Sequence, residues 1–226
     1  LGKVKSPLSD KLNSVMWGEF NLKELFGKST RGKRLRSADR VSGSLPFITA
    51  GEAAEGVSAF IGNKVTVFQK NTTTIDMFGS AKYRNYKYGA DDHIAVVHTE
   101  HLSKPASVFV TAAINKASHT GEFHYGRNFY AKDADELTIK LPVKNNEVDF
   151  DFMAEFIIEL ESSKNKKLKY YLSATGLNKY KLTSSDESVL DRLEKTNWAS
   201  FKIEDVLDWQ MGISELNPLH LDSLSV

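Results

Sequence analysis

Short runs of alternating or continuous apolar residues recur through the first two thirds of the chain. Several are rich in β-branched side chains and lie between glycines or other turn residues, the pattern typical of β-strands. The predicted strands are Leu45–Thr49, Lys64–Gln69, Thr72–Phe78, His93–Thr99 and Leu137–Leu141. We expect Thr72–Phe78 to pair with Lys64–Gln69 and to turn at Gly79-Ser80.

Helical patterns with capping signals mark two shorter segments. Residues 103–118 have Ser103 as an N-cap, Pro105 in the first turn and Gly121 as a stop signal. Residues 184–195 begin with Ser184 or Ser185 as the cap, followed by acidic residues that suit the helix dipole. Both are predicted helices.

A longer helical stripe follows Pro142 and ends before Gly176. Its apolar positions are Phe152, Met153, Phe156, Ile157, Leu160, Leu168, Tyr171 and Leu172. A helix of about 25 residues would be close to 40 Å long at its usual rise. Either it packs on the sheet of its own domain, or it is a spacer whose partner helix comes from another part of the chain or another subunit. We favour the spacer.

The reason is a repeated segment. Residues 17–26 read WGEFNLKELF and residues 198–207 read WASFKIEDVL, so that every apolar position matches without a gap. Such self-similarity indicates a duplicated unit of roughly 180 residues that begins near Trp17. The chain would then hold one complete copy and the start of a second. The alternative is that both segments share a common amphipathic pattern.

Composition narrows the class of protein. The chain has 226 residues, of which 41% are hydrophobic and 26% charged, as expected for a globular protein with a sizeable core. It contains no cysteine, which excludes disulfides and thiolate metal ligands. It also lacks a long apolar run and a signal-peptide pattern. We therefore expect a cytoplasmic protein that does not contact membranes.

The net charge of +1 is uninformative, but the charges are unevenly distributed. Basic residues concentrate between Lys23 and Arg40, whereas acidic residues concentrate in 147–161 and 186–208. One basic face would be the electrostatic footprint of a protein that binds a phosphate backbone. The predicted phosphate contacts are Lys28, Arg31, Lys33, Arg34, Arg36 and Arg40.

The sequence carries no recognisable catalytic or metal-binding motif. The chain has no dinucleotide or phosphate loop, no H-E-x-x-H, no G-x-S-x-G and no nuclease or adenine methyltransferase core. His93, His98 and His101 are close in sequence, but a strand would turn them to different faces. Asp91-Asp92 is better explained as the start of a strand. We predict a protein without catalysis of its own, with no metal and no cofactor.

Two clusters combine basic, amide and aromatic side chains within glycine-bounded loops. Such side chains can contact base edges, phosphates or sugars. The predicted base-reading residues are Lys82, Tyr83, Arg84, Asn85, Tyr86, Lys87, His124, Tyr125, Arg127 and Asn128. The alternative is that these residues form solvated hairpin tips. Taken with the basic loop, they favour contact with nucleic acid.

The order of several loose motifs resembles a known family. The chain reads G-x-L-P-F-I-T-A-G, then a strand pair with a Gly-Ser turn, A-x-x-F-V-x-x-A-I, Y-G-R-N, I-x-L-P and D-F-x-F-M-x-x-F-I. These motifs lie at 43–51, 72–80, 106–114, 125–128, 139–142 and 149–157. They resemble the target-recognition domains of restriction-modification specificity subunits of type I, type IIB and type IIG systems, over residues 14 to 207.

The resemblance implies an architecture. The fold would be α/β, a target-recognition domain of mixed strands and peripheral helices followed by a long spacer helix. Such proteins generally carry two recognition domains, joined by long helices that act as a ruler and dock methyltransferase subunits. Here residues 14–147 would be the recognition domain, 148–196 the helical spacer and docking region, and 197–226 the start of a second, truncated repeat.

The resemblance also implies a function and partners. The chain would recognise a double-stranded DNA sequence and direct methyltransferase subunits, with a nuclease subunit in some systems, to that site. A homodimer through the spacer helix would present two identical half-sites. Two alternatives remain. The chain could be the specificity segment of a single-chain methyltransferase-nuclease whose catalysis lies elsewhere, or a protein-interaction module that uses its long helix.

Overall fold

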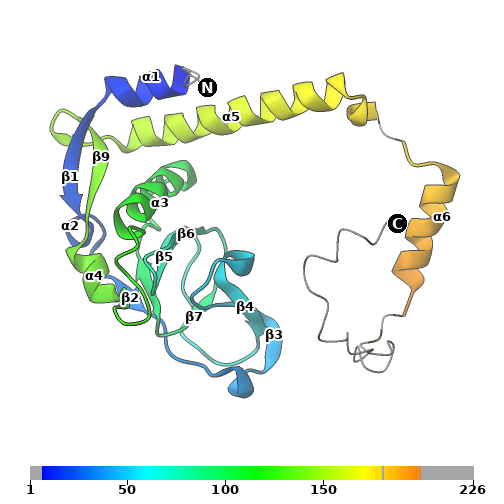
Figure 1. Cartoon of the computed structure of the whole chain (residues 1–226), viewed down its shortest axis with the longest axis horizontal. Helices are drawn as coiled ribbons and strands as arrows, with labels where there is room; N and C mark the ends of the chain where they lie inside the picture. Colours follow the sequence, from blue (N-terminus) through cyan, green and yellow to red (C-terminus); the bar gives the residue numbers. More distant parts are fainter. Residues whose placement is uncertain (1–6, 180, 198, 200–226) are drawn as a thin grey trace, which may run out of the picture. The chain divides into compact units, whose positions relative to one another are not determined.

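A computed structural model describes residues 7–179, 181–197 and 199 (Figure 1). The chain divides into two compact units, Leu1–Tyr171 and Leu172–Val226. All described strands lie in the first unit, which mixes helices and strands and confirms the predicted α/β class. The second copy of the repeated segment, 198–207, falls outside the described residues except for Ala199. No helix of the described part is both long and apolar enough to cross a membrane.

The elements alternate irregularly along the first unit. The helices are α1 (Pro7–Ser14), α2 (Leu22–Phe26), α3 (Lys104–Ser118), α4 (Ala131–Glu136) and α5 (Phe150–Ala174), with short 3-10 turns η1 (Ser37–Asp39) and η2 (Ala53–Gly56). The strands are β1 (Met16–Asn21), β2 (Thr30–Arg31), β3 (Ser42–Ile48), β4 (Val57–Ile61), β5 (Thr72–Asp76), β6 (Ala81–Arg84), β7 (Gly89–Ala90), β8 (Ile94–Val97), β9 (Thr138–Lys144) and β10 (Glu147–Val148).

The strands form three small sheets. Their orders are β1-β9-β10, β2-β8-β5-β6 and β4-β3-β7, and every pairing is antiparallel except that of β3 with β7. The four-stranded sheet is central because all residues of β5 and β8 are buried. The threonines of β5 satisfy their hydroxyls internally, as in the 2.6 Å hydrogen bond between Thr73 Oγ1 and Thr111 Oγ1.

One predicted strand is wrong. Residues 64–69 form no ladder with other described residues, and their one pairing within this part of the chain is a single bridge between Phe68 and Tyr88. Consequently β5 pairs with β6 and β8 rather than with this segment. The other predicted strands are confirmed with small shifts in their ends. The apolar alternation of 64–69 instead packs Phe68 against Tyr88, with ring centroids 5.5 Å apart.

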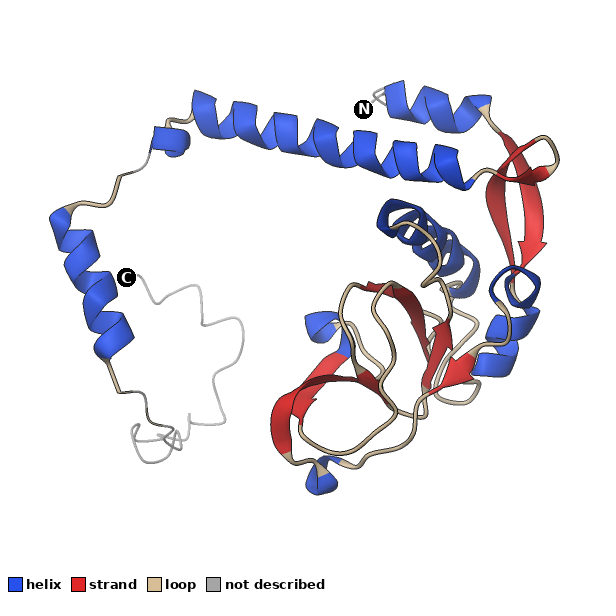
Figure 2. Ribbon diagram, turned by 180° about the vertical axis from the view of Figure 1, so that it is seen from behind, coloured by secondary structure: helices blue, strands red, loops and turns tan. Residues whose placement is uncertain are grey.

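Helix α3 covers the four-stranded sheet and begins as predicted. Ser103 caps it by accepting a hydrogen bond from the backbone N–H of Ala106. Val110 and Ile114 are fully buried in the core that α3 shares with the sheet. Figure 2 shows α3 lying between the sheet and α5. The helix therefore fixes the loops at the ends of the neighbouring strands.

Helix α5 behaves differently in its two halves. Met153, Phe156 and Ile157 are buried in the core, and the Phe156 ring meets Phe109 of α3 edge-on at 5.8 Å. Beyond Leu160 the side chains are mostly exposed, Leu168 to 55%. The first half thus packs on its own domain, as one of the two interpretations predicts. The exposed second half leaves the spacer role as a prediction.

The first copy of the repeated segment spans β1 and α2. Leu22 and Phe26 are buried in the core, whereas Trp17 is partly exposed and stacks on Phe109 with ring centroids 6.4 Å apart. The indole Nε1 of Trp17 donates to the Leu12 carbonyl at the end of α1. The segment therefore joins the three-stranded β1 sheet to the helices.

The second unit contains the described helix α6 (Ser184–Lys195), and 3-10 turn η3 (Leu177–Lys179) precedes it. Thr183 caps α6, rather than the predicted Ser184 or Ser185. Its hydroxyl accepts from the Asp186 N–H, and the Asp186 carboxylate accepts from Thr183 in return. The Thr183 hydroxyl, and then its backbone N–H, lower the pKa of Asp186 by stabilising the charged form.

Candidate functional site

Several loops converge on one end of the four-stranded sheet. The pairings of Asp76 with Ile94 and of Arg31 with Ala95 bring the last residues of β5 and β2 to the beginning of β8. The beginning of β6 also lies there, because Ala81 pairs with Ile75. We call this the Asp76 end of the sheet. Three predicted site segments meet there. They are the part of the basic loop that follows β2, the start of β6 and, through the turn described next, residues 124–127.

The turn from Asp76 to Ser80 is held rigidly. Asp76 is buried, and its Oδ1 accepts hydrogen bonds from the backbone N–H groups of Phe78 and Ser80. Gly79 has a φ of +82°, and a Cβ at this position would lie 2.2 Å from the Ser118 carbonyl oxygen. Ser118 Oγ donates to the Gly79 carbonyl across 2.6 Å. Only glycine fits here, and the turn is fastened to the end of α3.

A tight hairpin stands beside this turn. His124 and Arg127 exchange two backbone hydrogen bonds of 3.0 and 2.9 Å, and the Gly126 N–H donates to His124 Nδ1. The side chain of Tyr125 is at the tip and contacts Phe78 edge-on, with ring centroids 5.3 Å apart. The Arg127 guanidinium lies over the ring of Phe123, 5.3 Å from its centroid. We call residues 123–129 the Tyr125 hairpin.

The predicted cluster at 82–87 is divided by the fold. Lys82 lies at the Asp76 end, where it is 3.1 Å from Glu52 and 3.7 Å from Asp76. Asn85, Tyr86 and Lys87 lie beyond the opposite end, because Arg84 pairs with Thr72. The cluster therefore does not form one surface. Tyr83 donates its hydroxyl to Asn71 Oδ1, and burial raises its pKa.

Arg84 is a correction to the predicted base-reading set. Its side chain is buried, with 1% of the residue exposed. Nε donates to Thr74 Oγ1, Nη1 to the Tyr86 hydroxyl and Nη2 to the Glu55 carbonyl. A guanidinium so engaged cannot reach a base without breaking these bonds. Arg84 lies opposite the buried Thr72 at the end of β6 and is buried with it, which composition alone does not reveal.

One loop near the site was not identified from the sequence. Residues 51–56 connect β3 to β4, and the non-glycine residues Ala54 and Glu55 both have positive φ, 47° and 55°. The loop is tied to the Asp76 end because the Gly51 N–H donates to Asp76 Oδ2. The pKa of Glu52 is lowered mainly by a hydrogen bond from Ser80 and, to a smaller extent, by one from Lys82. Partial burial raises this pKa by less than either bond lowers it. The glycines at both ends were the available signal.

The basic loop runs past the beginning of β8. Its backbone is fixed where the Lys33 N–H donates to the Ala90 carbonyl and the Leu35 N–H to Asp91 Oδ1. Four exposed cations take part in none of the ion pairs of the described residues: Lys28, Arg31, Lys33 and Arg34.

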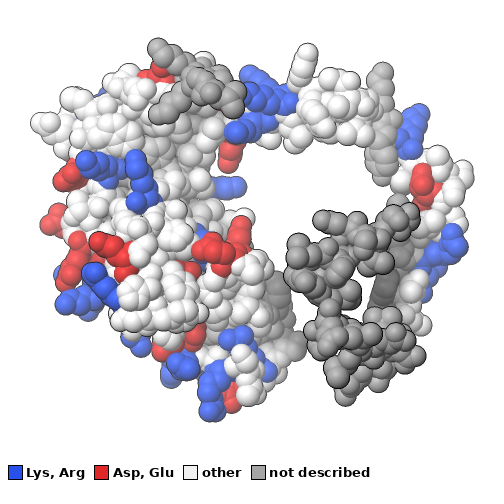
Figure 3. Space-filling view, in the orientation of Figure 1, with Lys and Arg blue, Asp and Glu red and all other residues white. Residues whose placement is uncertain are grey.

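The other two basic side chains of this loop have intramolecular partners. Arg36 pairs with Asp39 at 2.7 Å. Arg40 donates to the Leu35 carbonyl and to Ser58, and its guanidinium lies over the Phe47 ring. On the face drawn in Figure 3, basic and acidic side chains are interspersed, so this view does not present the single basic face that was expected.

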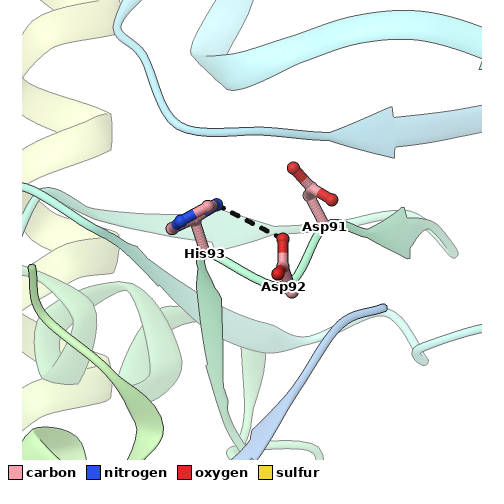
Figure 4. Close-up of side chains that lie close together, drawn as sticks. All are labelled: Asp91, Asp92 and His93. Atoms are coloured by element: carbon pink, nitrogen blue, oxygen red, sulfur yellow. Dashed lines mark ion pairs between the residues drawn. The ribbon is translucent and has the colours of Figure 1, made fainter. Parts of the chain in front are cut away.

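Asp91, Asp92 and His93 form a compact polar group at the turn before β8 (Figure 4). Their ligand atoms lie within 4.8 Å of one another, and His93 Nδ1 is 3.3 Å from Asp92 Oδ1. Asp91 also accepts the Leu35 N–H, so it positions the basic loop. His98 instead hydrogen-bonds with Thr30 and Glu100, and the His101 ring contacts the Phe26 ring.

Comparison with known proteins identifies similar sequences and folds. Residues 14–170 match the model of the type I restriction modification DNA specificity domain. The specificity subunit S.BcgI of a type II restriction enzyme from Heyndrickxia coagulans is 25% identical over 155 residues, which cover 67% of this chain and 45% of that protein.

Solved structures are also similar. A chain from a structure on complex assembly and conformational transition of the type I R-M system is 16% identical, with a TM-score of 0.51 over 86% of this chain and 45% of that one. The S subunit of a type I system from M. genitalium is 19% identical, with a TM-score of 0.49 over 78% of this chain and 50% of that one. The chain thus spans about half the length of these proteins.

Proposed function

This chain belongs to the type I restriction modification DNA specificity domain family, and we propose that it binds double-stranded DNA at a specific sequence. It would be the specificity component of a restriction-modification system and would carry out no catalysis itself. Its role would be to hold its target sequence at a fixed position relative to partner subunits that modify or cut the DNA.

The observation that carries this proposal is the combination of groups at the Asp76 end of the sheet. Arg31 and Lys33, which have no ion pair among the described residues, lie at the start of β8. The Tyr125 hairpin stands beside the Asp76–Ser80 turn at the same end of the sheet. Cations supply attraction to phosphates that does not depend on sequence, whereas side chains on a rigid tip can read base edges. A DNA-reading protein needs both within one footprint.

We assign the roles of individual residues accordingly. Phosphate contacts come from Lys28, Arg31, Lys33 and Arg34, with Arg36 and Arg40 contributing after they exchange their present partners. Base contacts come from His124, Tyr125, Arg127 and Asn128. Of the cluster at 82–87, only Lys82 adjoins this footprint, while Asn85 and Lys87 are exposed at the other end of the sheet.

The partners would be methyltransferase subunits and, in a restriction complex, a nuclease subunit. A second copy of this chain is a further candidate partner, because the second half of α5 leaves Leu168 and Tyr170 exposed. Two copies related by a two-fold axis would present identical half-sites. Analytical ultracentrifugation over a range of concentrations, with and without DNA, tests this dimer, and a monomer under all conditions contradicts it.

The function is tested by selection from a randomised duplex library at near-physiological salt, followed by sequencing of the bound DNA. The selection is run with the protein alone and with a methyltransferase subunit added. An enriched motif in either case supports the proposal. Weak binding that depends steeply on salt and enriches no motif in both cases contradicts it. No salt-dependent binding at all would favour the protein-interaction alternative.

A further inference from the structure

Tyr125 is unusually exposed for a large aromatic residue. The residue is 84% exposed, and its hydroxyl makes no hydrogen bond among the described residues. Burial of an aromatic ring normally contributes to stability, so this position gains little from folding. Exposure at the tip of a hairpin is the arrangement expected of a side chain that becomes buried against another molecule.

The hairpin that carries Tyr125 is fixed by contacts at its base. Phe129 is buried, its N–H donates to the Met77 carbonyl, and its ring meets Phe123 edge-on at 4.8 Å. Phe78, on the glycine-dependent turn, holds the Tyr125 ring at an interplanar angle of 84°. The ring is therefore positioned before any ligand binds. A preorganised aromatic side chain loses little conformational entropy on binding.

The surroundings of the ring suit a nucleic acid. Arg127 is exposed two residues away and lies over Phe123, and His124 is exposed on the other side of the tip. The basic loop approaches the same end of the sheet. An apolar ring flanked by positive and hydrogen-bonding groups matches DNA, in which stacked bases lie between phosphate chains.

We propose that the Tyr125 ring inserts between two base pairs of the target and stacks on a base. This inference rests on the proposed function and specifies how the hairpin reads DNA. A wedge partly unstacks one step and bends the duplex, and flexible pyrimidine–purine steps resist this least. The hairpin would then contribute sequence preference through the deformability of one step, in addition to any hydrogen bonds from Arg127.

The test compares four variants with the wild type on the duplex found by selection, in the assembly in which that selection succeeds. Tyr125→Phe keeps the ring and removes the hydroxyl, Tyr125→Leu keeps an apolar wedge, and Tyr125→Ala removes both. Phe60→Ala is the matched control, because Phe60 is a 59% exposed aromatic residue on β4, in a different sheet. Affinity is measured by fluorescence anisotropy, and unstacking by 2-aminopurine placed at successive positions of the target.

We expect the wild type and Tyr125→Phe to raise 2-aminopurine fluorescence at one step and to bind equally well. Tyr125→Leu should keep part of this signal. Tyr125→Ala should lose it and bind roughly 5- to 150-fold more weakly, the range found when a stacking aromatic is removed. Phe60→Ala should match the wild type.

Unchanged affinity of Tyr125→Ala, or equal losses in Tyr125→Phe and Tyr125→Ala, would overturn the wedge while leaving sequence-specific binding intact. The second result would assign the contact to the hydroxyl. A wild type that prefers no sequence would overturn the proposed function and the wedge together.

Discussion

Arg84 Nη2 donates to the backbone carbonyl of Glu55 across 2.8 Å, and this bond joins the edge strand β6 to an exposed turn in the left-handed region. Two consecutive non-glycine residues with positive φ are costly, and they persist only where the surroundings fix them. Arg84 is therefore a structural residue of the first unit. Its side chain supports the loop that adjoins the Asp76 end of the sheet.

Arg84→Ala should lower the free energy of unfolding by about 2–4 kcal/mol, because it leaves buried polar groups without partners and opens a cavity. Urea denaturation followed by circular dichroism measures this loss. Arg127→Ala is the control, since its exposed side chain should change stability by less than about 0.5 kcal/mol. Equal stability of the two variants would contradict the structural role of Arg84.

Gly79→Ala should be much more damaging than Gly121→Ala. Both glycines have positive φ, 82° and 86°, so both substitutions incur about 1–2 kcal/mol of backbone strain. Only Gly79 also faces a backbone atom, the Ser118 carbonyl oxygen, whereas nothing lies within 4 Å of a Cβ at Gly121. The difference between the thermal unfolding midpoints of the two variants measures the cost of the clash with Ser118. Similar midpoints would contradict a turn that is packed tightly against α3.

Substitutions along α5 should divide at Leu160. Phe156→Ala should cost about 3–5 kcal/mol, because Phe156 is buried against Phe109. Leu168→Ala should leave the unfolding of the first unit nearly unchanged, because Leu168 is exposed. Chemical denaturation at low protein concentration makes the comparison. A large loss for Leu168→Ala that grows with protein concentration would instead reveal a partner for this half of the helix.

Alanine at Arg31, Lys33 or Arg34 should weaken DNA binding to a similar extent on all sequences. Removing one cation from a phosphate should reduce the slope of log affinity against log salt by about 1. Lys144→Ala is the control, because this exposed lysine lies at the turn between β9 and β10, in a different sheet. A substitution that changed the preferred sequence but not the salt slope would assign that residue to base reading instead.

Local signals predicted α3, α5 and α6, because capping and periodicity act over a few residues, whereas the shorter α1, α2 and α4 were not predicted. Ser103 caps α3, and α5 spans almost the expected length. The failures involve long-range contacts. Residues 64–69 have the alternation of a strand, yet only Phe68 finds a partner, and Val67 is exposed. Arg84 looks like its exposed neighbours in sequence, but its pairing opposite Thr72 directs it inward.

The candidate site was predicted in part for the same reason. The sequence identified the Tyr125 hairpin and the basic loop as separate segments, and the fold brings both to the Asp76 end of the sheet. The loop at 51–56 was missed, because its role depends on hydrogen bonds to Asp76 and Arg84, which are distant in sequence.

The proposed function requires that the Asp76 end of the sheet contact a specific DNA sequence. The chain has no cysteine, so single cysteines can be introduced at exposed positions and their alkylation rates compared with and without DNA. Glu122→Cys, beside the Tyr125 hairpin, and Lys144→Cys, on the β1-β9-β10 sheet, form the pair. Slower alkylation at position 122 alone, with the selected target and not with a scrambled duplex, is the predicted result. Protection at 144 but not at 122 would contradict this placement of the DNA.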